Sequence, residues 1–140
     1  MLKSIFEAVA KRAEWRCEYC RVPKSAYQTP FHVDHIIARQ HGGGSDMNNL
    51  AFASFHCNRH KGPNVASTYP SGSMAIIPLF HPRNDRWRSH YQFDEAVIRP
   101  QTECGEATVS LLRMNDPAPL TVRLSLIAEG IRFPSIITIE

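Results

Sequence analysis

The chain has 140 residues, which is room for one domain with an appended subdomain and excludes a multidomain machine. Hydrophobic residues make up 43% and charged residues 21% of the sequence, which predicts a globular protein with a buried core and excludes a disordered acidic tail or a polybasic arm. Sixteen Lys and Arg residues against thirteen Asp and Glu residues give a net charge of +3, a mild basic bias that permits an anionic partner without requiring one.

Two kinds of targeting segment are missing from the sequence. No stretch approaches the roughly 18 consecutive apolar residues that span a bilayer, and the N-terminal segment lacks the apolar centre of a secretory signal peptide. We therefore expect a cytoplasmic protein without a membrane partner.

The charge is unevenly distributed along the chain. Residues 1–63 hold nine basic and five acidic residues, which gives +4, whereas residues 64–140 hold seven and eight, which gives −1. The basic field therefore belongs to the N-terminal half.

The first predicted element is a helix over residues 5–14. Ser4 and Glu7 have the spacing of a capping box, and an apolar face of helical period follows them. The CxxC sequence that comes next predicts a tight knuckle, which Pro23 closes.

A strand, a loop, a second strand and a short helix are predicted after the knuckle. Alternating β-forming residues predict a strand over 31–36, the glycine-rich segment 42–46 predicts a loop, and residues 50–53 predict a short extended segment. A helix over 55–61 is expected to end at Gly62, which a proline follows.

The C-terminal half is expected to mix strands and helices. Extended segments over 64–69 and 74–80 flank a predicted turn at 70–73, and a polar stretch then leads to a strand near 91–98. Helical periodicity covers 105–114 and 119–129, the second introduced by Asp116 and Pro117 and ended by Gly130.

Cysteine and histidine gather in the N-terminal half. In a reducing compartment, cysteines at CxxC spacing favour metal ligands or buried thiols over disulfides. Cys104 stands alone and is expected to be a small buried hydrophobe. The other three cysteines are Cys17, Cys20 and Cys57, and five of the seven histidines (His32, His35, His41, His56 and His60) fall close to them in the sequence.

The order of these elements resembles the HNH endonuclease motif of the ββα-metal nucleases. The resemblance is carried by Asp34 and His35 at the end of a strand, by Asn49 and by Asn58. The segments CEYC, FHVDHI, GGG, NNLAF and CNRHKG follow the family's order and spacing over about residues 15–63.

The resemblance implies an α+β fold. Its core would be a ββα-metal hairpin and helix, flanked by the N-terminal helix and by a mixed α/β C-terminal extension. We expect the nuclease core, with its cysteine knuckle, over residues 1–63 and the extension, packed on that core, over residues 64–140.

The chemistry of phosphodiester hydrolysis explains the residue types of the motif. The reaction needs a nucleophilic water, a counter-charge for the phosphate and help for the leaving oxygen, and a metal ion with one base supplies all three.

The resemblance assigns a role to each residue of the motif. Asp34 and Asn58 would bind the metal, His35 would be the general base, and the backbone carbonyl of Asn49 would orient His35. Because adjacent strand residues point to opposite faces, Asp34 and His35 cannot both bind one ion unless the strand ends or bulges there. Two oxygen donors favour Mg²⁺ or Mn²⁺.

A second, structural metal site is expected at the cysteines. The resemblance implies a Zn²⁺ ion held by two CxxC pairs, and this chain offers Cys17, Cys20 and Cys57, with Ser54 where the fourth cysteine would stand. His56 or His60 replacing that ligand is one interpretation, and a weak or empty site is another.

DNA is the expected partner. Arg39, Arg59, His60 and Lys61 are candidates for contacts to its phosphates, with plain solvation of these side chains as the other interpretation. A basic and aromatic cluster follows in the extension (Arg83, Arg86, Trp87, Arg88 and His90); it suits a nucleic-acid edge, although packing of Trp87 explains it equally well.

The sequence therefore predicts a metal-dependent HNH endonuclease that hydrolyses DNA phosphodiester bonds with a histidine general base. One alternative is an HNH-derived or zinc-ribbon-like module that binds DNA without cleaving it. Another is a small zinc-stabilised interaction protein. The intact set of Asp34, His35 and Asn58 favours the enzyme, because a binding module has no chemical need for a base beside two oxygen ligands.

Overall fold

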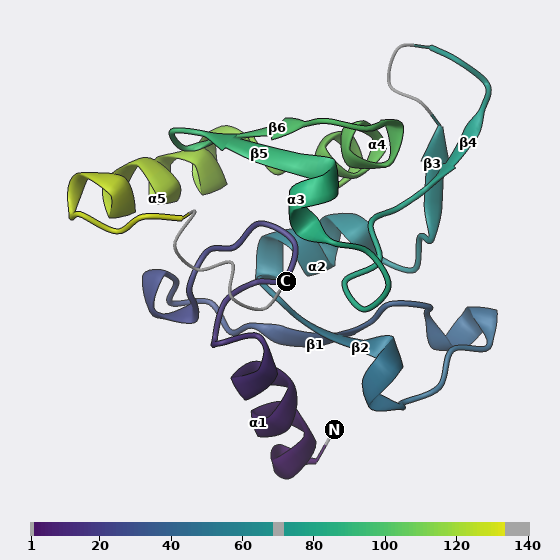
Figure 1. Ribbon diagram of the computed structural model, residues 1–140. Helices are drawn as coiled ribbons and strands as arrows, with labels where there is room; N and C mark the ends of the chain where they lie inside the picture. The colour runs from purple at the N-terminus through teal and green to yellow at the C-terminus, as the bar shows by residue number, and fades with distance from the viewer. Residues whose placement is uncertain (1, 69–71, 134–140) are drawn as a thin grey trace.

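Short strands paired in twos and surrounded by helices form the protein in the computed structural model, which describes residues 2–68 and 72–133 (Figure 1). The expected mixture of helix and strand is confirmed at this level. The antiparallel pairs are β1 (His32–His35) with β2 (Leu50–Ala53), β3 (Ala66–Thr68) with β4 (Ile76–Pro78), and β5 (Tyr91–Asp94) with β6 (Val97–Pro100). The α-helices are α1 (Lys3–Arg12), α2 (Phe55–Lys61), α3 (Trp87–His90), α4 (Glu103–Leu111) and α5 (Pro117–Ala128), with 3-10 turns at Lys24–Ala26, Arg39–His41 and Met47–Asn49.

Helix α1 starts two residues earlier than the sequence predicted. Its N-cap residue is Leu2, which makes no side-chain cap bond, so the capping box predicted at Ser4 is wrong: Ser4 already lies in the first turn. The predicted apolar face is right, since Val9 and Ala10 are buried.

The hairpin of β1 and β2 carries the predicted motif. His35 pairs with Leu50 and Asp34 with Ala51 across the two strands. In Figure 1, α1 lies on one side of this hairpin and α2 on the other. The far edge of β2 is also covered, because Glu18 exchanges two hydrogen bonds with the main chain of Phe52, through its own N–H and through its carboxylate.

Helix α2 follows β2 directly and spans the predicted residues. The side chain of Ser54 caps its first turn by accepting a hydrogen bond of 3.2 Å from the N–H of Cys57. The helix ends at Gly62, whose φ of 52° lies in the left-handed region that favours glycine.

The extension departs from the prediction at one strand. The predicted strand near 91–98 is a hairpin, β5 and β6, because the chain turns at Glu95 with a φ of 51°. Both C-terminal helices start two residues earlier than predicted, α4 because Thr102 caps it. The extended segments 64–69 and 74–80 shorten to β3 and β4, and the predicted turn between them lies largely outside the described residues.

One hydrophobic core joins the two halves of the chain. It includes Val9 and Phe52 from the N-terminal half and Trp87 and Tyr91 from the extension. Trp87 is 1% exposed and its Nε1 donates to the carbonyl oxygen of Tyr19 at 2.8 Å, so Trp87 packs in the core. The boundary between residues 63 and 64 stays a prediction. Among the helices of the described residues, none is long and apolar enough to cross a membrane.

Candidate active site and metal centre

Asp34 and His35 are the last two residues of β1, and they differ in burial. Asp34 is 4% exposed. Its Oδ2 accepts a hydrogen bond of 2.7 Å from the hydroxyl of Tyr19, and its Oδ1 accepts one of 3.3 Å from the ammonium of Lys61. His35 is only partly buried. The motif thus consists of a buried carboxylate and an accessible imidazole.

The carboxylate of Asp34 is held between a phenol and an ammonium group. Burial raises the pKa of Asp34, while the charge of Lys61 and the hydrogen bond from Tyr19 act in the opposite direction. An ionised carboxylate has about four acceptor positions, and these two partners use only some of them. Asp34 therefore has the donor chemistry for Mg²⁺ or Mn²⁺.

Asn58 has the second oxygen donor predicted for the metal. It lies in α2, one turn before Lys61, and is half-buried. Its side chain makes no hydrogen bond to residues 2–68 or 72–133. The amide oxygen of Asn58 is therefore free to accept a hydrogen bond or to bind a cation.

The environment of His35 favours the neutral form of its imidazole. Nε2 lies 3.0 Å from Ser45 Oγ and accepts a hydrogen bond of 3.4 Å from Arg39 Nε. Burial lowers the pKa of His35, and the charge of Arg39 lowers it further, against the opposite effect of Asp34. A neutral imidazole whose Nε2 is an acceptor is the form that takes up a proton.

Asn49 fastens the loop that follows His35. Its Oδ1 accepts a hydrogen bond of 2.9 Å from the N–H of Ile37, and its Nδ2 donates to the carbonyl oxygens of Ile37 at 3.0 Å and Gly44 at 2.7 Å. Its own carbonyl accepts from the N–H of Ile36 at 2.9 Å. Asn49 therefore holds the loop around His35, and its predicted action on the imidazole itself stays a prediction.

The four side chains predicted to contact DNA phosphates divide into two groups. Arg39 and Arg59 are exposed and His60 is half-buried. Lys61 is 1% exposed, and its ammonium donates to Asp34 and, at 3.3 Å, to the carbonyl oxygen of His35. Lys61 thus supports the motif from inside, which differs from the prediction, because a buried ammonium needs an anionic partner.

Cys17, Cys20 and Cys57 converge as the sequence predicted. All three are fully or almost fully buried free thiols, and their sulfur atoms lie within 4.8 Å of one another. The sulfur ligands of a tetrahedral zinc ion lie about 3.8 Å apart, given Zn–S bonds near 2.3 Å. The three sulfurs therefore fit a zinc ion after a small adjustment.

The charges of the three thiols also favour a cation among them. Burial raises the pKa of Cys17, but hydrogen bonds from Cys20 and Cys57 outweigh it and lower that pKa well below its usual value. Next to that thiolate, the pKa of Cys20 rises to about 12 and the pKa of Cys57 rises well above its usual value. A divalent cation at this position would favour ionisation of all three thiols.

Neither histidine proposed for the fourth zinc ligand joins the cysteines. Within the described residues, the group of donor atoms contains the three cysteines alone. His56 Nε2 instead hydrogen-bonds the carbonyl oxygen of Arg113 at 2.8 Å, and the ring of His60 stacks edge-on against His56. Ser54 Oγ lies 3.9 Å from Cys20 Sγ. This hydroxyl, or a water molecule, is the better candidate for the fourth ligand.

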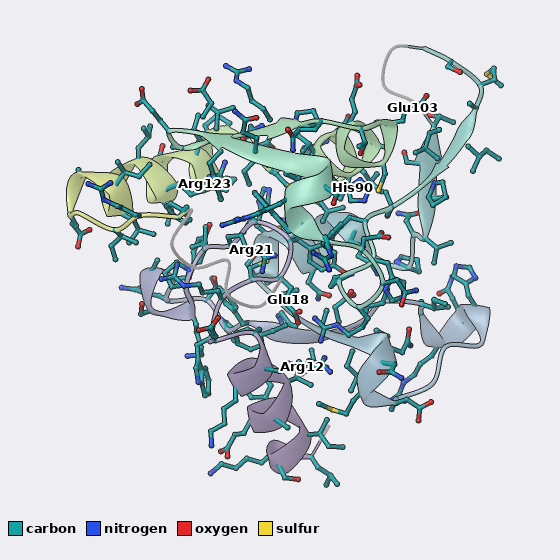
Figure 2. The ribbon with its side chains drawn as sticks, viewed as in Figure 1. Arg12, Glu18, Arg21, His90, Glu103 and Arg123 are labelled. Atoms are coloured by element: carbon teal, nitrogen blue, oxygen red, sulfur yellow. The ribbon has the colours of Figure 1, made fainter. Side chains whose placement is uncertain are left out.

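Arg123 of α5 is a residue that no sequence signal connects to the cysteines. It is fully buried, and Figure 2 shows it pointing from α5 toward the interior. Burial lowers the pKa of Arg123, and the neighbouring Cys20 and Cys57 raise it. Its Nη1 is buried without a hydrogen-bond partner among the described residues. Three thiolates and a Zn²⁺ ion would together carry a charge of −1. The guanidinium of Arg123 supplies a positive charge near them.

A basic cavity joins part of the predicted basic and aromatic cluster to Arg12 and Arg21, which sequence reasoning did not connect to it. It has a volume of about 520 Å³ and lies where the knuckle meets the segment before α3. Figure 2 shows Arg12, Glu18 and Arg21 one above the other between α1 and α3. Arg12 also donates to the carbonyl oxygen of Leu50, the residue paired with His35. The charged residues of the lining are Arg12, Arg21, Arg83, Arg86, Glu18 and Asp85, which together carry +2.

Comparison with family models identifies the region that holds most of these residues. Residues 17–64 match the model of the HNH endonuclease family. The match begins at Cys17 and includes the whole motif from Asp34 to Asn58. Comparisons with curated proteins and with solved structures found no match.

Proposed function

We propose, from the HNH endonuclease-family domain at residues 17–64, that this protein is a metal-dependent endonuclease that hydrolyses DNA phosphodiester bonds. The observation that carries the proposal is that β1 ends on two adjacent residues of different burial, the buried carboxylate of Asp34 and the partly exposed imidazole of His35, whose pKa is lowered. A base and an anionic ligand on adjacent residues are what the reaction requires.

His35 is the proposed general base. Its imidazole takes the proton of the attacking water, and Ser45 and Arg39 hold the ring in place. The loop fastened by Asn49 carries both of these partners. To act as the base, the imidazole of His35 must be neutral before the reaction. It must also reach solvent, so that it can release the proton afterwards.

Asp34 and Asn58 are the proposed ligands of the catalytic ion, Mg²⁺ or Mn²⁺. When bound, such an ion supplies counter-charge to the phosphate and to the leaving oxygen. The hydrogen bonds from Tyr19 and Lys61 hold the carboxylate of Asp34 in place, and both favour its ionised form. We also propose that Cys17, Cys20 and Cys57 hold a structural Zn²⁺ ion that ties the knuckle to α2.

DNA is the proposed substrate, held mainly by its phosphates. The +4 balance of residues 1–63, the exposed Arg39 and Arg59 and the basic cavity near Leu50 support this interaction. In this proposal residues 1–63 are the nuclease core, residues 64–140 are an extension packed on it, and the protein acts in the cytoplasm.

The alternative is a module that binds DNA without cleaving it. The observation in its favour is the ion pair of Lys61 and Asp34, because an ammonium at that carboxylate competes with a metal ion. The two functions differ in their response to metal, which a cleavage assay measures directly.

The deciding experiment incubates the purified protein with plasmid DNA and Mg²⁺, Mn²⁺ or a chelator. We expect cleavage with either ion and none with the chelator. Asn58→Ala should abolish cleavage but retain DNA binding, because it removes an oxygen ligand and no positive charge. Gln28→Ala is the control, because it also removes a side-chain amide but lies at an exposed position before β1, and it should cleave as the wild type does. DNA binding without metal-dependent cleavage in the wild type would support the binding module instead.

A further inference from the structure

A second group of metal-ligating side chains lies in the extension, outside the HNH domain. A carboxylate oxygen of Asp85, a ring nitrogen of His90 and the sulfur of Cys104 lie within 4.8 Å of one another, and all three residues are half-buried. We propose that Asp85, His90 and Cys104 form a second zinc site. This proposal does not rest on the proposed nuclease function.

The donor set points to zinc among the divalent ions. One oxygen, one nitrogen and one sulfur ligand suit Zn²⁺, whereas Mg²⁺ and Ca²⁺ prefer oxygen ligands alone. The charges also balance: Zn²⁺ with one carboxylate, one thiolate and a neutral imidazole sums to zero. Three protein ligands leave one tetrahedral position for water. Donor atoms around such an ion lie about 3.3 to 3.8 Å apart, so the present spacing needs only a small contraction.

His90 is oriented for metal binding by its other ring nitrogen. The Nδ1 atom lies 2.7 Å from the hydroxyl of Thr102, which also accepts the N–H of Gly105 at 3.0 Å. Metal-binding histidines commonly use one nitrogen for such a hydrogen bond and the other for the ion. The Thr102 contact therefore leaves Nε2 of His90 as the ligand atom.

Asp85 and Cys104 are also positioned by contacts that do not involve a metal. One carboxylate oxygen of Asp85, Oδ2, accepts a hydrogen bond of 2.8 Å from the N–H of His81. Cys104 lies in the first turn of α4, where its carbonyl accepts from the hydroxyl of Thr108 at 2.7 Å. Burial and the nearby Asp85 raise the pKa of the Cys104 thiol. Zinc binding then forms a Zn–S bond and releases the thiol proton to solvent.

Gly105 brings the cysteine and the histidine together. A Cβ atom at this position would collide with the carbonyl oxygen of His90, so only glycine lets the start of α4 approach the end of α3 this closely. Figure 2 shows His90 between these two helices. A zinc ion here would fasten three segments that are separate in the sequence: the segment before α3, the end of α3 and the start of α4.

The test counts zinc ions bound to the full-length chain, by titration of the metal-free protein with Zn²⁺. We expect Cys104→Ser and Asp85→Asn each to lose one equivalent of bound zinc, or to weaken that equivalent by tenfold or more, and to leave binding at Cys17 unchanged. Two variants are matched controls that should bind as much zinc as the wild type does. They are Ser110→Ala, on the exposed face of α4, and Asp94→Asn, in β5. Equal zinc binding in Cys104→Ser and in the wild type would overturn the proposal.

A second measurement needs no substitution and so does not depend on how the variants fold. The metal-free native protein is treated with a thiol-alkylating reagent with and without Zn²⁺, and modification of Cys104 is followed by mass spectrometry. Cys104 is the least buried of the four cysteines. We expect Zn²⁺ to slow its alkylation markedly. An unchanged rate would contradict zinc binding at Cys104.

Discussion

The ammonium nitrogen of Lys61 lies 3.3 Å from the carboxylate of Asp34, and the two side chains are only 2% and 5% exposed. A buried carboxylate without a partner is costly, and removing one member of such a pair typically costs about 3 to 5 kcal/mol. The pair joins α2 to β1, the two elements that carry the proposed metal ligands. Lys61 therefore contributes to the stability of the motif as well as to its charge.

Lys61→Met should destabilise the protein most at neutral pH. Burial already raises the pKa of Asp34 above 3.8, and loss of the ammonium should raise it further. A carboxyl group with a raised pKa in the folded state favours folding at low pH, where it is protonated, and loses this contribution as the pH rises through that pKa. The deficit of Lys61→Met should therefore shrink as the pH falls toward 4.

Thermal unfolding of both proteins between about pH 4 and 7 tests this prediction. Lys11→Met is the matched control, because Lys11 is exposed in α1 and pairs with no carboxylate of residues 2–68 or 72–133. A deficit that is constant over this pH range would assign the loss to packing of the methylene chain and not to Asp34.

The pH profile of cleavage should reflect the lowered pKa of His35. An unperturbed histidine loses its basic form below about pH 6.5. Because burial and Arg39 lower the pKa of His35, the acid limb of the rate profile should lie below that value. Arg39→Gln should move the limb to higher pH, since the charge of Arg39 is one of the effects that lower the pKa of His35.

His35→Ala should lower the cleavage rate by about a hundredfold or more while DNA binding survives, as expected for loss of a general base. Arg59→Gln is the control for the Arg39 variant, because it also removes an exposed arginine but does not contact His35. If Arg39→Gln and Arg59→Gln have the same pH profile, then Arg39 does not set the pKa of His35.

The sequence predicted the elements that carry local signals. The hairpin and α2 follow from alternating residues, a glycine-rich loop and Gly62, and the structure has them at or within two residues of the predicted positions. The hairpin of β5 and β6 was missed because its turn uses Glu95 with a positive φ and no glycine or asparagine signal. Propensity does not predict a left-handed glutamate.

The candidate site also combines contacts that the sequence predicts with contacts that it does not. The convergence of Cys17, Cys20 and Cys57 follows from spacing, but the burial of Lys61 against Asp34 depends on how α2 packs on β1. Arg123 is more than sixty residues from the nearest of these cysteines in the sequence, and only the shared core brings it to them. Long-range contacts of this kind have no local pattern.

Ser54→Cys should have opposite effects on stability with and without zinc. With zinc, a fourth thiolate at this position should tighten the ion held by the three cysteines and raise the unfolding temperature. Without zinc, the variant loses the oxygen that caps α2 at the N–H of Cys57, a change that costs about 0.5 to 2 kcal/mol.

Thermal unfolding in the presence of zinc and of a chelator measures both effects. The Cys104→Ser background removes the second proposed zinc site, so that changes report on Cys17, Cys20 and Cys57 alone. Ser25→Cys, at an exposed position of the 3-10 turn after the knuckle, controls for the added thiol. If Ser54→Cys is less stable in both conditions, Ser54 does not stand at a ligand position.

DNA affinity should fall steeply with added salt, because binding through phosphates releases condensed counterions. Arg59→Gln and Arg86→Gln should each weaken binding similarly on unrelated DNA sequences and make the salt dependence shallower. Both side chains are exposed, one on α2 and the other at the basic cavity.

Arg99→Gln is the control for these two variants. Because Arg99 is paired with Asp94 on β5, its loss should leave the salt dependence unchanged. Fluorescence anisotropy with labelled duplexes at several salt concentrations measures the slopes. Equal slopes for the wild type, Arg59→Gln and Arg86→Gln would place the DNA on another face of the protein.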